Sequence, residues 1–179
     1  MKRGLLIGLA AILALSMAGC FQKQARATLN GKSITLSNYT NLGELYYNLS
    51  DDFELIGETT GYDNRTREYR LSNNGKHFWI FIAEKSSTLH SMQDEVDAIS
   101  ANPENKNCEV TTKTVDGKES TYVTFETNDP EHGGNVTKHY CYVIFEDFGL
   151  QYFYRIEFIN CTEDTKSFED VFLSEIKTT

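Results

Sequence analysis

The chain has 179 residues, of which 40% are hydrophobic, and it carries 26 acidic against 17 basic side chains, for a net charge of −9. A chain of this length is typical of one domain with a substantial core. The negative charge repels phosphate backbones and anionic lipid headgroups. This argues against nucleic acid as a partner and against a membrane contact made by surface charge.

The first nineteen residues have the layout of a cleavable signal peptide. Lys2 and Arg3 form a cationic start, residues 4–15 are apolar, and Ala-Gly directly precedes Cys20. The apolar stretch is too short for a stable membrane span. A cysteine in this position resembles the bacterial lipobox, which implies cleavage before Cys20 and attachment of lipid, including palmitate, to that cysteine. The alternative is an ordinary secretion signal with an incidental cysteine.

The expected lipoprotein is held by its lipid on the extracytoplasmic face of the cell membrane. Removal of residues 1–19 takes away two basic side chains, so the mature chain has a net charge of −11. Attachment then depends on Cys20, because this charge cannot hold the domain to an anionic surface. Residues 20–26 are expected to form a tether that spans at most about 20 Å, and residues 27–179 are expected to form a single globular domain.

Short strands are predicted for the first part of the domain. Asn30-Gly31 is typical of a type I′ hairpin turn, because both residues accept a positive φ. Four strands are expected to follow, over residues 45–49, 52–59, 67–72 and 77–84, the last two joined around Asn73-Asn74-Gly75. Residues 78–83 are apolar throughout, which indicates a strand that is covered on both faces.

A first helix is predicted to begin near Thr88 or Ser91 and to end before Pro103. Its apolar stripe consists of Leu89, Met92, Val96 and Ile99.

A hairpin around Asp116-Gly117 follows the helix. This turn places Val110 opposite Val123 and Cys108 opposite Phe125, so all four side chains are expected to share one core face.

The last hairpin is predicted to run from residue 137 to residue 160 and to turn near Phe148-Gly149. With that turn, one face carries Cys141, Val143, Phe145, Tyr152, Tyr154, Ile156 and Phe158. The other face carries Tyr140, Tyr142, Ile144, Phe153 and Ile159, with Arg155 and Glu157 among them. A closing helix is expected after Asp164 or Thr165, with an apolar stripe of Phe168, Val171, Phe172 and Ile176.

Three cysteines remain if Cys20 carries lipid: Cys108, Cys141 and Cys161. An extracytoplasmic setting permits a disulfide, although three thiols cannot all pair within the chain. Cys141 and Cys161 are expected on opposite faces of their hairpin, which makes a bridge between them geometrically poor. A bridge from Cys108 to either of them stays open.

The order of the elements resembles that of the Mog1/PsbP-like family. The matching segments are residues 46–53, the turn 115–118, and residues 152–159 before the final helix. The resemblance implies an α/β (α+β) fold, an α/β/α sandwich in which helices flank an antiparallel sheet. It also implies a non-catalytic role. The competing fold is a cystatin- or NTF2-like α+β domain, in which a curved sheet wraps a helix.

The loop over residues 128–135 is the most chemically varied segment. Asp129, Glu131 and Asn135 offer oxygen ligands to a hard cation, but their spacing is not that of an EF-hand, and a solvated turn is the more ordinary interpretation. The sequence contains no GxSxG, SxxK or HExxH motif. We therefore expect no catalytic residues, no cofactor, and a binding or accessory module whose partner is an envelope protein or a small ligand.

The alternative is a metal-dependent or hydrolytic envelope enzyme that uses this loop. An enzyme would need a deep pocket with histidines or carboxylates converging near the loop, whereas a binding module would show an exposed aromatic patch. A third alternative, a structural spacer, would show neither feature. Tyrosines suit such a patch because their rings are apolar and their hydroxyls polar. The candidates are Tyr39, Tyr46, Tyr47, Tyr62 and Tyr69, unless they pack between the sheet and the helices.

Overall fold

The computed structural model describes residues 24–61, 64–86, 91–132, 136–146 and 152–178. Several predictions concern residues outside these ranges: the signal peptide, Cys20, Tyr62, Leu89, Asn135 and the turn at 148–149.

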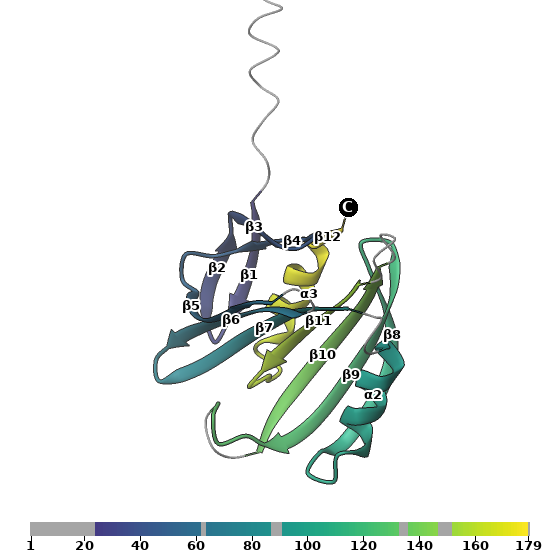
Figure 1. The fold of residues 1–179 in the computed structure, drawn as a ribbon. Helices are drawn as coiled ribbons and strands as arrows, with labels where there is room; N and C mark the ends of the chain where they lie inside the picture. Colours follow the sequence, from purple (N-terminus) through teal and green to yellow (C-terminus); the bar gives the residue numbers. More distant parts are fainter. Residues whose placement is uncertain (1–23, 62–63, 87–90, 133–135, 147–151, 179) are drawn as a thin grey trace, which may run out of the picture.

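A seven-stranded antiparallel sheet forms the body of the molecule, in the order β5-β6-β7-β11-β10-β9-β8 (Figure 1). Its strands are β5 (Glu54–Thr60), β6 (Asn64–Asn73), β7 (Lys76–Ser86), β8 (Lys106–Val115), β9 (Lys118–Asn128), β10 (Val136–Glu146) and β11 (Tyr152–Ile159).

Two smaller sheets and one helix pack on the inner face of this sheet. The first is the hairpin of β1 (Ala25–Leu29) and β2 (Lys32–Leu36), and the second has the order β12-β4-β3. Its strands are β3 (Asn38–Leu42), β4 (Leu45–Leu49) and β12 (Lys177–Thr178). The helix is α3 (Lys166–Ser174), whose Phe168 and Phe172 are fully buried in the main core.

The outer face of the main sheet is covered by α2 (Met92–Ala101). Val96 of this helix packs in a second, smaller core with Val123, Cys141, Val143 and Phe153. The described structure consists mainly of antiparallel strands, with one short helix on each face of the main sheet. This is an α+β architecture, and it confirms the predicted α+β class.

The tight turns follow the sequence signals. Residues 30–31, 74–75 and 116–117 each form a two-residue hairpin turn in which both residues have positive φ, from 49° to 77°. Helix α2 begins after Ser91, which forms a capping box with Asp94, and it ends at Ala101, before Pro103, as predicted. In the part of the chain that the structure describes, no helix is long and apolar enough to cross a membrane.

The predicted faces of the last hairpin are wrong. Tyr142 pairs with Ile156, and Cys141 pairs with Glu157, so even-numbered residues oppose even-numbered ones. The prediction assumed a two-residue turn, whereas Glu146 pairs with Tyr152 and five residues lie between them. The pairing register of the hairpin is therefore shifted by one residue from the predicted one. Because side chains alternate along a strand, this shift exchanges the two faces of one strand relative to the other.

The prediction that Val110 is a core residue is also wrong. Val110 does pair with Val123, but it is 52% exposed because β8 is an edge strand of the sheet. Cys108 does not oppose Phe125, since the register shifts between Lys106 and Glu109, and its side chain is only partly buried.

The folded part begins earlier than expected. Strand β1 starts at Ala25, so Ala25 and Arg26 belong to the domain rather than to the tether over 20–26. Two short strands, β3 and β12, were not predicted.

Candidate functional site

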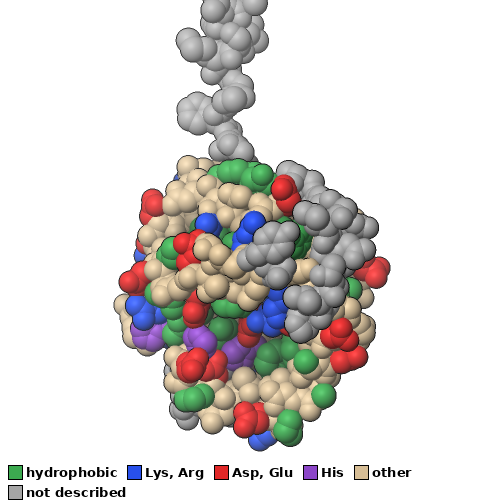
Figure 2. Space-filling view, viewed as in Figure 1, with side chains coloured by type: hydrophobic (Ala, Val, Ile, Leu, Met, Phe, Trp, Pro, Cys, Tyr) green, Lys and Arg blue, Asp and Glu red, His purple; other side chains and the backbone are tan. Residues whose placement is uncertain are grey.

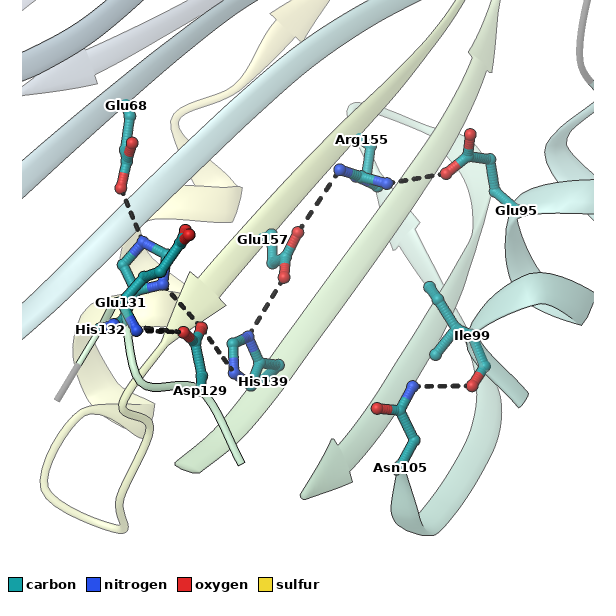
Figure 3. Close-up of polar contacts among 10 residues, drawn as sticks. All are labelled: Glu68, Glu95, Ile99, Asn105, Asp129, Glu131, His132, His139, Arg155 and Glu157. Carbon is teal, nitrogen blue, oxygen red and sulfur yellow. Dashed lines mark hydrogen bonds and ion pairs between the residues drawn. The ribbon is translucent and has the colours of Figure 1, made fainter. Parts of the chain in front are cut away.

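Charged side chains form a row across the outer face of the main sheet, beside α2. Figure 2 shows histidine side chains lying among acidic and basic ones on the viewed surface. Figure 3 shows how the row is built from β6, the loop after β9, β10, β11 and α2. We call it the outer-face network; its members are Glu68, Asp129, His132, His139, Glu157, Arg155 and Glu95.

His132 lies between two carboxylates at one end of this network (Figure 3). Its Nδ1 is 2.6 Å from Oδ2 of Asp129, and its Nε2 is 2.9 Å from Oε1 of Glu68. Burial opposes a charged imidazole, but the hydrogen bonds to Glu68 and Asp129 outweigh it and raise the pKa of His132. Likewise burial opposes a charged Asp129, but the hydrogen bond and charge of His132 lower the pKa of Asp129.

The loop that carries His132 is also held by backbone contacts. Oδ1 of Asp129 accepts hydrogen bonds from the backbone N–H groups of Glu131, at 3.0 Å, and His132, at 3.2 Å. This is the local turn that an aspartate before a proline favours, and here the proline is Pro130. The same carboxylate therefore shapes the loop with one oxygen and binds the imidazole with the other.

The other half of the outer-face network ties α2 to the sheet. Nδ1 of His139 is 3.1 Å from Oε1 of Glu157, and Nη1 of Arg155 donates to Oε2 of Glu95 at 2.7 Å. Lys85 pairs with the same Glu95. Burial opposes the charge on Glu157, but the His139 bond and the Arg155 charge lower the pKa of Glu157. Each carboxylate of this half thus has a partner of opposite charge or a histidine.

Of the three candidate cation ligands, Asp129 and Glu131 lie in the part of the chain that the structure describes, whereas Asn135 lies outside it. Asp129 forms a hydrogen bond with His132, and Glu131 is exposed and, within the described ranges, forms a hydrogen bond through its backbone N–H and none through its side chain. Among the described residues, no group of three or more His, Cys, Asp or Glu is arranged to hold a metal ion. Sequence reasoning missed His132 and His139 as members of a cluster. The available signal was the pair Arg155 and Glu157, two charges within a largely apolar strand.

An open cleft of about 660 Å³ lies at the end of the sheet where the β6–β7 turn is found. Five segments line it: Asn30 of the β1–β2 turn, residues 75–77 at the β6–β7 turn and the start of β7, Glu126 of β9, Lys138 and Tyr140 of β10, and residues 160–163. None of the outer-face network residues is among these lining residues.

Asn160 connects the cleft to the outer-face network. Its Nδ2 donates to the backbone carbonyl oxygens of His132, at 2.9 Å, and His77, at 3.3 Å. Asn160 has a φ of +66°, a conformation that asparagine tolerates better than most residues. One wall of the cleft is therefore fastened to the loop that Asp129 and His132 hold.

The three cysteines of the domain are all free thiols in the structure. Cys161 lines the cleft and packs with the main core, whereas Cys141 lies in the smaller core under α2, on the other face of the sheet. Burial raises the pKa of both thiols, so both stay protonated near neutral pH and are poor nucleophiles. Cys108 also packs against the smaller core.

The described candidate tyrosines do not form an exposed aromatic patch, and two of them pack in the core, which is the other interpretation that the sequence left open. Tyr47 and Tyr69 are buried and share a hydrogen bond of 2.8 Å between their hydroxyls. Tyr39, which stacks on Tyr46, is 65% exposed and is the one aromatic side chain of the described residues that is largely exposed.

A scan against models of known protein families found no match, and a search of curated proteins also found none.

Proposed function

We propose that the chain is a lipoprotein anchored on the extracytoplasmic face of the membrane, and that its domain is a non-catalytic binding module. The first twenty residues support the anchor, because a cationic start, an apolar stretch and Cys20 after Ala-Gly resemble a lipoprotein signal. The open cleft carries the binding function. Its volume of about 660 Å³ lies within the usual range of ligand pockets, which is about 300–1,000 Å³.

The position of the cleft suits an anchored receptor. Strand β1 begins at the end of the molecule where β3, β4 and β12 lie, whereas the β1–β2 and β6–β7 turns lie toward the other end (Figure 1). A lipid attached before β1 would therefore leave the cleft directed away from the membrane surface and open to solutes.

We further propose that the fold is of the Mog1/PsbP-like kind, an α/β/α sandwich. The arrangement of α2 on one face of the antiparallel sheet and α3 on the other supports this assignment over a cystatin- or NTF2-like fold. In the latter, a curved sheet wraps a helix on one side only. Fold alone does not assign an activity, so the binding function rests on the cleft.

The alternative of an enzyme using the loop 128–135 has weaker support. His132 and His139 do converge near that loop with carboxylates. These groups are bonded to one another, however, and none of them lines the cleft. The loop segment that the structure describes thus offers hydrogen-bonded pairs but no open position for a reacting molecule.

Metabolic labelling with a palmitate analogue tests the anchor. We expect the native chain to be labelled and to fractionate with membranes, and Cys20→Ser to lose the label and appear in the soluble fraction. Cys108→Ser is the matched control, since its thiol is partly buried in the folded domain, and it should keep the label. A Cys20→Ser chain that keeps both label and membrane location would contradict the lipoprotein assignment.

A ligand screen tests the binding function. The full-length chain is screened by thermal shift against amino acids, peptides, sugars, nucleotides and fatty acids, and any hit is measured again on Thr162→Trp. Thr162 is exposed at the cleft, so an indole there fills part of the cleft and should abolish binding. Thr112→Trp places the same ring on the exposed edge strand β8 and should leave binding unchanged. The absence of any ligand sensitive to Thr162→Trp would refute the proposal.

A further inference from the structure

Resting on the proposed binding function, we propose that the cleft binds a short peptide with free ends. Lys76 would hold the terminal carboxylate of the peptide, and Glu163 would hold its terminal ammonium group. The observation behind this assignment is that, among the described residues that line the cleft, Lys76 and Glu163 are the cation and the anion without an ion-pair partner.

The charges of the cleft differ in how far they are already neutralised. Glu126 and Lys138 face each other at 3.9 Å. Within the described part of the chain, Lys76 and Glu163 form no ion pair, and neither side chain makes a hydrogen bond. Both line the cleft and are exposed, so a ligand can reach them without displacing a described protein partner.

This combination disfavours ligands with a single sign of charge. A simple anion would meet Glu126 and Glu163 as well as the lysines, in a protein whose net charge is −9. A simple cation would meet Lys76 and Lys138. A molecule that carries both charges at a distance satisfies both sets, and a peptide with free ends is such a molecule.

Neutral groups of the cleft suit the peptide backbone between the two ends. Asn160 uses its amide N–H groups on the carbonyls of His77 and His132, which leaves its amide oxygen as an acceptor with no partner among the described residues. The Tyr140 hydroxyl and the Thr162 hydroxyl also have no hydrogen-bond partner in the described ranges. Each hydroxyl can donate to a carbonyl or accept from an N–H group. The partly buried ring of Tyr140 adds an apolar surface for a small side chain.

Calorimetry with three matched peptides tests the assignment. The full-length chain, purified from membranes in detergent, is titrated with trialanine, with N-acetyl-trialanine and with trialanine amide. We expect trialanine to bind and each capped form to bind roughly three- to tenfold more weakly, since each loses one charged contact at a solvated site.

Variants then connect each end of the peptide to one side chain. Lys76→Gln should weaken the binding of trialanine by the same factor. It should remove the preference for trialanine over trialanine amide and keep the preference for trialanine over N-acetyl-trialanine. Glu163→Gln should remove the preference for trialanine over N-acetyl-trialanine and keep the preference over trialanine amide. Arg26→Gln and Glu119→Gln are the charge-matched controls; both residues are exposed and lie outside the cleft, so they should leave all three affinities unchanged.

Equal binding of capped and free peptides would overturn the peptide assignment, as would trialanine binding that neither Lys76→Gln nor Glu163→Gln alters. If trialanine fails to bind but a ligand of another class binds and is lost in Thr162→Trp, the peptide assignment is wrong and the binding function stands. If no class of ligand binds, both proposals fall.

Discussion

Asp129→Asn tests whether the outer-face network holds the loop after β9. Asparagine keeps an oxygen for the backbone N–H groups of Glu131 and His132, but it removes the charge that faces the imidazole of His132. The lost contact is a charge-assisted hydrogen bond of 2.6 Å between side chains that are 17% and 19% exposed. Hydrogen bonds to charged groups contribute about 1.5–3 kcal/mol, so we expect a loss of about 2 kcal/mol in the free energy of unfolding.

The loss should depend on pH with a definite sign. The pKa of His132 is raised in the folded state, so its contribution to stability is complete below its ordinary pKa of 6.5 and is lost as the pH rises through the raised value. The pKa of Asp129 is lowered, so its contribution is present above the ordinary 3.8 and is lost as the pH falls through the lowered value. The effect of Asp129→Asn should therefore be largest between these limits and decline on both sides.

Urea unfolding followed by the fluorescence of Trp79 measures this profile. Trp79 is the only tryptophan, and its ring lies edge-on to that of His132, with 5.2 Å between the ring centroids. At a stability loss of about 2 kcal/mol, the melting temperature should fall by about 4–8 °C. Glu131→Gln is the matched control, because it removes a carboxylate from the same loop whose side chain is exposed; its effect should stay within about 0.5 kcal/mol. Equal losses in the two variants, or a loss that does not change with pH, would refute the reasoning.

Two further predictions concern buried polar groups of the core. Burial raises the pKa of Glu169, even though Thr165 donates a hydrogen bond to its carboxylate. The native protein should therefore lose stability relative to Glu169→Gln as the pH rises above the ordinary pKa of 4.5. Urea unfolding of both proteins at about pH 5 and about pH 8 measures this loss, and a difference in stability that is the same at both pH values would contradict the prediction. Tyr154→Phe should lower the free energy of unfolding by about 1–3 kcal/mol, because the Tyr154 hydroxyl donates to Glu84 at 2.7 Å. Tyr142→Phe should lower it by less than about 0.5 kcal/mol, because the buried Tyr142 hydroxyl has no partner among the described residues. Equal costs in the two tyrosine variants would count against this account.

Features that depend on a few neighbouring residues could be predicted from the sequence. The turns at Asn30-Gly31 and Asp116-Gly117 need only two residues that accept positive φ, and the start of α2 needs only Ser91 and the side chain three positions later. The α+β class also followed, because the strand and helix periods of the apolar residues are local patterns.

Features that depend on loop length or on strand order could not be predicted in this way. The faces of the last hairpin changed because five residues, rather than two, separate the paired Glu146 and Tyr152. Val110 obeys the alternation expected of a core residue, but the alternation does not show that β8 lies at the edge of the sheet. The cleft is harder still, because its five segments extend from Asn30 to residue 163 and meet only in the folded sheet.

The two clusters of charge differ in whether their charges remain available to a ligand. In the outer-face network, Asp129, His132 and Glu157 are bonded to each other or to neighbouring side chains, and these bonds fix the loop after β9 and the position of α2. A ligand that took over one of these side chains would have to break such a bond, and the fold would lose the stability that the bond contributes. These side chains are therefore poorly placed to bind a ligand. In the cleft, Lys76 and Glu163 contribute no pairing to the described fold. A bound peptide would supply the partners that the described chain does not. We therefore propose a structural role for the outer-face network and ligand recognition for the cleft.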